Sequence, residues 1–139
     1  ITQNRAKGRN TFIFIDEIYL LFQHEYSANF LFTLWKRVRK YGAYCTGITQ
    51  NVDDLLQSHT ARTMLANSEF LIMLNQASTD RIELAKLLNI SDLQLSYITN
   101  VDAGHGLIKV GSSLVPFANK FPKNTKLYKL MTTKPGEGA

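Results

Sequence analysis

The sequence is poor in residues that form disulfides or bind metals. Its 139 residues include one cysteine, Cys45, and three histidines, none at metal-ligand spacing from that cysteine. A single thiol forms no internal disulfide, and this pattern gives no zinc site, so we expect a protein of a reducing compartment. No apolar run approaches the roughly 20 residues that a helix needs to cross a bilayer. Residues 1–10 also lack the apolar core of a signal peptide.

What remains is the composition of a folded globular protein. Apolar residues make up 45% of the chain and charged residues 19%, and the length fits one compact domain with a substantial core. The net charge of +5 permits an anionic partner such as a nucleic acid or a nucleotide. Composition therefore sets the class and leaves the function open.

Apolar runs and polar breaks alternate along the chain in the order expected of an α/β protein. Runs rich in β-branched and aromatic residues predict buried parallel strands at 11–16, 43–49 and 70–74. Two apolar runs around Gly111 to Ser113 predict an antiparallel hairpin, and residues 126–133 allow a final strand. Residues 1–10 are expected to form a loop, and residues 134–139 a flexible tail.

Helical spacing of apolar residues predicts several helices between these strands. They are expected at 17–23, 27–41, 52–57, 60–66, 78–90 and 91–100. In the helix at 27–41, the inward stripe is expected to be Phe30, Leu34, Val38 and Tyr41, widened by Leu31 and Trp35. The residues expected to cap or end helices are Ser27, Gly42, Asn51 and the Ser91–Gln94 capping box. In the helix at 78–90 the expected inward residues are Ile82, Ala85 and Leu88 or Leu87.

Polar side chains follow each of the three predicted parallel strands. They are Asp16-Glu17, Thr49-Gln50-Asn51 and Asn75-Gln76. In a parallel sheet, ligands bind at the carboxyl ends of the strands, so these groups are expected to face a common site.

An apolar strand that ends in Asp-Glu is the Walker B pattern of nucleotide hydrolases. One carboxylate can hold hydrated Mg²⁺ while the next orients the water that attacks a phosphate. The alternative is an ordinary strand-to-helix junction, with Asp16 as a cap and Glu17 favoured by the helix dipole. A strand beside Walker B that ends in a polar residue strengthens the first interpretation, because Gln50 would then read the γ-phosphate. A glutamine that satisfies loop backbone groups is the plainer alternative.

The basic stretch KRVRKYG, residues 36–42, also has two interpretations. One is a solvated helix end, where cations suit the C-terminal dipole. The other is an arginine finger, which neutralises charge on a phosphate bound by a neighbouring subunit.

The stretches FIFIDE, LWKRVRKYGAYCTGITQNVDDLL, LANSEFLIMLNQ and LYKLMTTKP span nearly the whole chain in this order. Together they resemble the C-terminal ATPase domain of the large conjugation ATPases of type IV secretion systems. These belong to the wider class of hexameric DNA translocases and conjugative coupling proteins with a RecA-like fold. The ending Thr-Thr-Lys-Pro is similar to versions from Gram-positive conjugative elements.

The resemblance implies roles for particular residues. Asp16 matches the Mg²⁺-associated Walker B acid, Glu17 the catalytic glutamate and Gln50 the sensor glutamine. Arg39, eleven residues before Gln50, matches the arginine finger, with Arg37 as a competing choice. Arg81 matches a helix start that in relatives can lie near the nucleotide or the subunit interface.

The resemblance has one large departure, because no G-x-x-x-x-G-K-S/T motif occurs in the chain. The P-loop should precede Walker B, so we expect residues 1–139 to be the C-terminal portion of one RecA-like ATPase domain. Its sheet should be incomplete, with parallel strands followed by an antiparallel hairpin and the P-loop strand absent between 43–49 and 70–74. A rearranged sheet, a strand from another copy or a domain-swapped dimer is expected to compensate.

The implied parent is an ATP-hydrolysing motor that uses ATP and Mg²⁺ and energises conjugative DNA transfer or type IV secretion. The chain alone is expected to be inactive. Implied partners are further subunits of a hexamer, secretion-channel and coupling proteins, and DNA, at the inner face of the bacterial plasma membrane. Two alternatives stay open. One is a non-catalytic basic α/β module that binds DNA or a secretion partner, and the other is a Mg²⁺ nuclease, for which no supporting motif is present.

Overall fold

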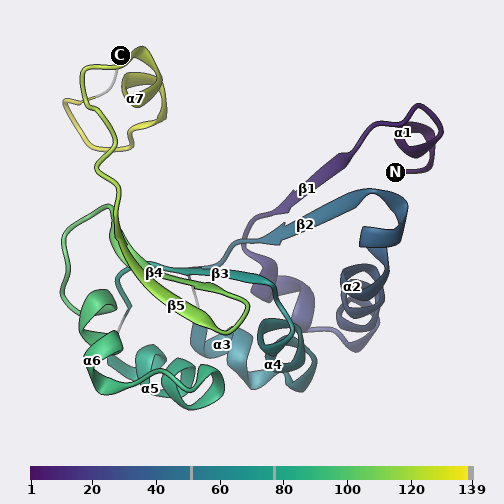
Figure 1. Ribbon diagram of the computed structural model, residues 1–139, viewed down its shortest axis with the longest axis horizontal. Helices are drawn as coiled ribbons and strands as arrows, with labels where there is room; N and C mark the ends of the chain where they lie inside the picture. Colours follow the sequence, from purple (N-terminus) through teal and green to yellow (C-terminus); the bar gives the residue numbers. More distant parts are fainter. Residues whose placement is uncertain (51, 77, 138–139) are drawn as a thin grey trace. The chain divides into compact units, whose positions relative to one another are not determined.

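The computed structural model describes residues 1–50, 52–76 and 78–137, which form two compact units, each with its own sheet (Figure 1). Unit 1 comprises Ile1–Ser68 and Thr79–Asn89, and unit 2 comprises Glu69–Ser78 and Ile90–Ala139. The cap expected at Asn51 lies outside the described residues. No described helix is long and apolar enough to span a membrane.

Unit 1 consists of helices around a short parallel pair of strands. Its elements are α1 (Thr2–Ala6), β1 (Thr11–Ile15), η1 (Ile18–Phe22), α2 (Glu25–Arg37), η2 (Val38–Tyr41), β2 (Ala43–Gly47), α3 (Val52–Gln57), α4 (His59–Ala66) and, after the first part of unit 2, α5 (Ser78–Leu88). Helix α1 lies within residues 1–10, where a loop was expected. The other elements follow the predicted order.

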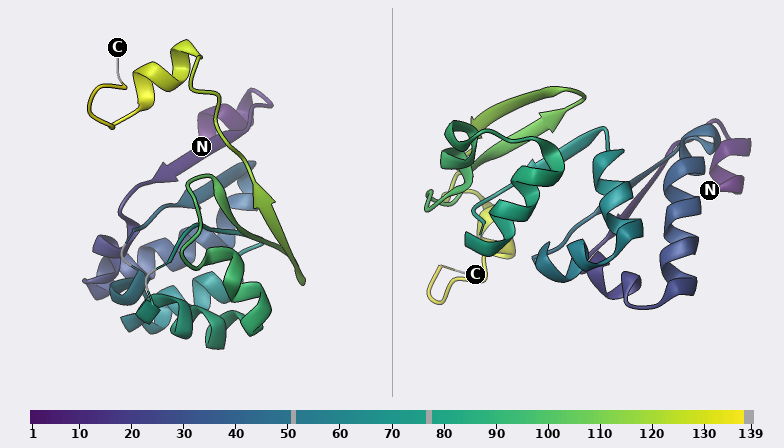
Figure 2. Two further views of the ribbon diagram at one scale, coloured as in Figure 1. Left: turned by 90° about the vertical axis from the view of Figure 1, so that its left-hand side faces the viewer. Right: turned by 90° about the horizontal axis from the view of Figure 1, so that it is seen from below.

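Strands β1 and β2 pair in parallel, with Thr11 opposite Ala43 and Ile15 opposite Gly47. Helices α2 and α4 lie on one side of this pair in all views (Figures 1 and 2). The prediction that β1 is buried on both faces is wrong, since Phe12 and Phe14 are 64% and 69% exposed. Alternate side chains of a strand point to opposite faces, and here one face carries the helices.

The core of unit 1 forms beneath the covered face of β1 and β2. One cluster of buried side chains comes from η1, α2, α3 and α4: Ile18, Leu31, Leu55, Ala61 and Met64. Trp35 and Phe22 pack against this cluster. Each large aliphatic side chain buried here contributes about 1.5–3 kcal/mol to folding.

The inward stripe predicted for α2 is partly wrong. Phe30 is 60% exposed, whereas Ala28 and Leu31 are buried, together with Val38 of η2. Ser27 is not the N-cap either, because its hydroxyl donates to the carbonyls of Leu21 and His24 from inside the helix. The buried stripe is therefore rotated by about one position from the predicted one. Only the packing of η1 and α4 against α2 decides which of its apolar side chains face the core. The end of the helix is confirmed, since Gly42 has a φ of 66° and its N–H reaches the Arg39 carbonyl.

Helix α5 was also predicted with a different inward face. Leu84 and Leu88 are buried, but Ile82 is 52% exposed. The helix ends before Asn89, whose φ of 55° is left-handed.

Unit 2 consists of an antiparallel sheet with short helices. Its elements are β3 (Phe70–Met73), α6 (Asp92–Leu95), η3 (Ser96–Ile98), β4 (His105–Val110), β5 (Ser113–Ala118) and α7 (Lys126–Met131). The strand order is β3-β4-β5 with both pairs antiparallel. The predicted hairpin is confirmed, with a two-residue turn between Val110 and Ser113 and a left-handed Gly111. The capping box of Ser91 and Gln94 is also confirmed.

One face of the β3-β4-β5 sheet is packed and the other is open. Leu107 and Ile98 are fully buried, and Met73 is 6% exposed on the same side of the sheet. Phe70 and Ile72 point the other way and are 63% and 65% exposed, so the expectation of a wholly buried third strand is wrong. Strand β3 pairs with β4, and no ladder joins it to β2 in the described residues. The fold is thus α/β, with a parallel pair of strands followed by an antiparallel sheet that contains the hairpin. The prediction that residues 70–74 form a third parallel strand is wrong, because β3 pairs antiparallel with β4.

The strand allowed at residues 126–133 is absent, and α7 occupies most of that range. Thr125 caps the helix by accepting from the Tyr128 N–H. Leu127, Leu130 and Met131 recur at helical rather than alternating spacing, and the prediction of a strand did not take this spacing into account.

Candidate functional site

The Asp16–Glu17 turn lies immediately after β1. Asp16 is exposed and Glu17 is half-buried. Glu17 has φ 47° and ψ 44°, a left-handed conformation that is uncommon for a residue with a side chain. The Glu17 N–H donates to Oδ1 of Asp16 at 2.9 Å, so the aspartate fixes the first bend of the turn.

Two backbone hydrogen bonds hold this turn against the end of β2. The Ile48 N–H donates to the Ile15 carbonyl at 2.8 Å, and the Ile18 N–H donates to the Ile48 carbonyl at 3.0 Å. Ile48 is therefore held on both sides of the Asp16–Glu17 turn. Since backbone groups make these bonds, the position of the two acids follows from strand pairing and tolerates change in the flanking side chains.

Gly47 permits this close approach. A Cβ at Gly47 would lie 2.7 Å from Cδ1 of Ile18 and 3.4 Å from Cη2 of Trp35. Ile18 is the first residue after the turn and is 5% exposed. The absent side chain at Gly47 thus leaves the space in which Ile18 anchors the turn to the core.

Gln50 lies two residues beyond Ile48 and is exposed. Because β1 and β2 are parallel and in register, their carboxyl ends meet at one edge, and Asp16, Glu17 and Gln50 all follow that edge. The predicted convergence of these two strand ends therefore agrees with the backbone of unit 1.

The third predicted polar strand end, Asn75–Gln76, serves unit 2 instead. Oδ1 of Asn75 accepts from the Val101 N–H, and the Gln76 side chain donates to the Leu74 carbonyl. The Gln76 N–H also donates to the Ile98 carbonyl. These amides hold the loop that precedes β4.

The candidate arginines lie elsewhere in unit 1. Arg39 is exposed in η2, before β2 begins, and Arg37 ends α2. The five-residue strand β2 separates the two ends by about 16 Å at roughly 3.3 Å per residue. Neither arginine is therefore brought to the acids of its own chain by β2. Arg81 lies in the first half of α5 and is half-buried.

The site does not contain a ready metal cage. Within the described ranges, no three His, Cys, Asp or Glu side chains group closely enough to hold a metal ion. Cys45 of β2 is half-buried, and burial raises the pKa of its thiol, so it remains a protonated packing residue at neutral pH.

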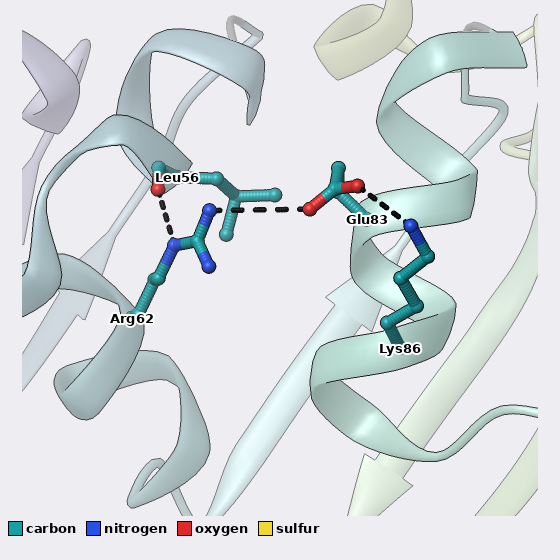
Figure 3. Close-up of polar contacts among 4 residues, drawn as sticks. All are labelled: Leu56, Arg62, Glu83 and Lys86. Carbon is teal, nitrogen blue, oxygen red and sulfur yellow. Dashed lines mark hydrogen bonds and ion pairs between the residues drawn. The ribbon is translucent and has the colours of Figure 1, made fainter.

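A polar cluster that the sequence reading missed lies between α4 and α5 (Figure 3). A guanidinium nitrogen of Arg62 lies 3.9 Å from Glu83, whose other oxygen pairs with Lys86 at 3.2 Å. Nε of Arg62 donates to the Leu56 carbonyl. These residues border a depression of about 220 Å³. The Glu83–Lys86 pair has the i,i+3 spacing visible in the sequence, but the pairing with Arg62 requires α4 and α5 to meet.

Comparison with known proteins agrees with this architecture. Residues 2–109 match the sequence model of the TraG P-loop domain. The fold matches the structure of VirB4 of Thermoanaerobacter pseudethanolicus with a TM-score of 0.76 and 25% identity, over 88% of this chain and 34% of that one. The chain thus spans about a third of the length of that VirB4 chain. Among curated proteins, no sequence matches.

Proposed function

Because the chain belongs to the TraG P-loop domain family, we propose that it is part of an ATP-hydrolysing motor for conjugative DNA transfer or type IV secretion. The observation that carries this proposal is the Asp16–Glu17 turn, held by Ile48 at the carboxyl edge of β1 and β2. That edge is where a parallel α/β sheet binds its ligand. Similarity to the VirB4 structure supports the same class of motor.

In this proposal Asp16, Glu17 and Gln50 have distinct roles. The donor set fits hydrated Mg²⁺, because one exposed carboxylate of Asp16 suffices for an ion that keeps much of its water. When bound, Mg²⁺ would neutralise phosphate charge. Glu17 accepts a proton from, or orients, the attacking water. Gln50 donates its amide to the γ-phosphate.

The left-handed backbone of Glu17 suits this division of labour. Asp16 already accepts the Glu17 N–H through Oδ1, so its second oxygen is the one directed to ligands. The bend at Glu17 gives its side chain a different direction from that of Asp16, and the backbone bonds of Ile15 and Ile18 fix both.

We assign the arginine finger to Arg39, acting on nucleotide bound by a neighbouring subunit. Its exposure and its place at the amino end of β2 support action in trans. Arg37 remains the competing choice, and Arg81 is assigned to the nucleotide or subunit interface. The motor is accordingly an oligomer, proposed as a hexamer that works with channel and coupling proteins at the cytoplasmic face of the membrane.

This chain by itself is proposed not to hydrolyse ATP, because it lacks a G-x-x-x-x-G-K-S/T motif to cradle the phosphates. The test therefore uses a longer protein in which a P-loop precedes Ile1. That protein should hydrolyse ATP, and Glu17→Gln should abolish turnover while nucleotide binding persists. Glu25→Gln, an exposed glutamate in the first turn of α2, is the matched control and should retain full activity.

Two results would count against the assignments. If turnover survives Glu17→Gln, that residue is not the one that handles the attacking water. Arg39→Ala should bind ATP normally and lose hydrolysis in the assembled oligomer, and mixing it with Glu17→Gln subunits should restore activity at some interfaces. Loss of binding in a monomer would instead assign Arg39 a role within its own subunit.

A further inference from the structure

The positive charge of the chain is concentrated at one place. Residues 119–137, here called the lysine segment, contain five lysines and one acid, Glu137, which gives a net charge of +4 out of +5 for the whole chain. The lysines are Lys120, Lys123, Lys126, Lys129 and Lys134. The remaining 120 residues are therefore almost neutral.

Apolar side chains stand among these lysines and are unusually exposed. Leu127, Leu130 and Met131 are 56%, 63% and 73% exposed. Their spacing along α7 puts all three on one face of the helix, with Lys126 beside that face and Lys129 on the polar side of the helix. Phe121, just before the helix, is 48% exposed.

The segment is nevertheless ordered by its own contacts. Glu137 accepts from the Tyr128 hydroxyl and pairs with Lys123 at 2.9 Å, an arrangement we call the Glu137 clasp. The rings of Phe121 and Tyr128 stack with centroids 6.3 Å apart. The clasp involves Tyr128 and Lys123, whereas Leu127, Leu130 and Met131 take no part in it and remain exposed to solvent.

We propose that the lysine segment binds the surface of a bilayer rich in anionic lipid. The apolar face of α7 enters the headgroup boundary, and the flanking lysines pair with lipid phosphates. A helix with apolar residues on one side and lysines around them is the arrangement that lies in such an interface. Charge complementarity favours anionic lipid, since each lysine near such a surface strengthens partition by about five-fold.

The chemistry of the segment fits lipid better than nucleic acid. It contains no arginine, the residue that forms bidentate hydrogen bonds with phosphates and base edges. Its two aromatic rings stack on each other, so neither is free to stack on a base. Exposed leucine and methionine side chains gain nothing from a solvated phosphate backbone. This inference stands apart from the proposed ATPase and requires neither nucleotide nor a P-loop.

The test uses the present chain and sedimentation with vesicles. It should bind vesicles of phosphatidylglycerol and phosphatidylcholine and fail to bind phosphatidylcholine alone. Raising the salt to about 0.5 M should weaken binding, because the Debye length then falls well below its value at 0.1 M, about 10 Å. Equal binding to both kinds of vesicle would overturn the proposal.

Matched variants distinguish a specific contact of the lysine segment from a general effect of charge or hydrophobicity. Lys126→Glu/Lys129→Glu should weaken vesicle binding at least about 25-fold, since two lysines at about five-fold each are lost. Lys7→Glu/Arg9→Glu makes the same charge change at exposed positions of unit 1 and should have little effect. Leu130→Ser should weaken binding about five-fold or more, whereas Leu93→Ser, at a still more exposed leucine of α6, should not.

All of these positions are exposed, so circular dichroism should show unchanged folding. Equal losses in the segment variants and their controls would refute the segment as the contact. Tighter binding to single-stranded or duplex oligonucleotides than to anionic vesicles, abolished by Lys126→Glu/Lys129→Glu, would replace lipid with nucleic acid and overturn the proposal.

Discussion

The two sheets of this protein differ in how their strands are joined, and this decides where chemistry can be placed. In unit 2, β4 and β5 are connected by a two-residue turn, so their ends meet within one hairpin. In unit 1, β1 and β2 run in parallel, and η1 and α2 lie between them in the chain. Both strands of unit 1 therefore end at the same edge, where separate polar turns can meet.

The polar residues of the two units are used accordingly. Asn75 and Gln76 satisfy backbone groups of their own unit, whereas Asp16 and Gln50 are exposed at a strand edge. One glycine in each unit differs in the same way. Gly106 allows β3 to approach β4, while Gly47 allows Ile18 to hold the acidic turn. The polar strand end of unit 2 thus serves the scaffold, and the candidate site lies in unit 1.

The largest effect is expected from Gly106→Ala, which should disrupt the packing of β3 against β4 in unit 2. The new Cβ would collide with the Met73 carbonyl oxygen and lie 2.8 Å from the Phe117 ring. We expect a loss of about 3 kcal/mol in unfolding free energy, the upper range for overpacking. Urea titration followed by far-ultraviolet circular dichroism measures this, with Gly111→Asn in the open turn as the control.

The single tryptophan, Trp35, distinguishes the units in that experiment. It packs in the core of unit 1, so its fluorescence should shift less in Gly106→Ala than the circular dichroism does. Coincident transitions in both signals would show that the two units unfold as one.

A smaller effect is expected from Gly47→Ala, which changes the contact between β2 and Ile18 in unit 1. Crowding against Ile18 should cost about 2 kcal/mol and should move the Trp35 transition directly, because the new Cβ would lie 3.4 Å from that ring. Thr46→Ala, at the preceding exposed position of β2, is the matched control. An unchanged Trp35 transition would show that Ile18 is free to shift.

Glu17 offers a sharper comparison of two substitutions at one position. Both Glu17→Gly and Glu17→Ala remove the carboxylate, but only glycine adopts φ 47° without strain. The glycine variant should be more stable than the alanine variant by about 1 kcal/mol. Thermal unfolding of both variants measures the difference, and equal stabilities would mean that the turn relaxes to another conformation.

The smallest effect concerns the Glu137 clasp and its dependence on pH. Hydrogen bonding from Tyr128, then the pairing with Lys123, lowers the pKa of Glu137 below 4.5. The clasp is therefore formed above pH 4.5 and lost as pH falls through the lowered pKa. Hydrogen bonding to Glu137 raises the pKa of Lys123 above 10.5, so the clasp also opens as pH rises through that raised value.

Side-chain carbon shifts of Lys123 and Glu137 should report both transitions by nuclear magnetic resonance, since they stay observable at alkaline pH. Glu137→Gln removes the acid transition of the clasp by removing its side-chain carboxylate, and Lys7→Gln provides a control with one ionisable group removed elsewhere. An acid transition that persists in Glu137→Gln would contradict the assignment.

Much of the secondary structure could be predicted from local patterns. The Ser91–Gln94 capping box, the Gly111 turn and the Gly42 helix end were read from the sequence and are present. These signals depend on neighbours within a few residues, so tertiary contacts are not needed to recognise them. Phe30 was misassigned because a helix with apolar residues around much of its circumference has no unique inward face.

The residues of the candidate site could be proposed from the sequence, but the contacts that position them could not. An apolar strand followed by Asp16-Glu17, and a second followed by Gln50, indicated a shared edge from strand order alone. Three features had no signal in the sequence, because each depends on segments that meet only after folding. They are the Ile48 hydrogen bonds on either side of the turn, the left-handed backbone of Glu17 and the pairing of Arg62 with Glu83.

By itself the sequence determined the class of fold, the order of the elements between residues 11 and 118 and the two acids at the end of β1, since periodicity and strand-end chemistry are local. Only the tertiary structure decided which faces of the strands are covered, where Arg39 lies relative to Asp16, and that α7 replaces a strand and presents Leu127, Leu130 and Met131 to solvent. The physical reason is that burial depends on which surfaces meet, and a one-residue rotation of a helix or the absence of one covering layer changes it without changing any local pattern.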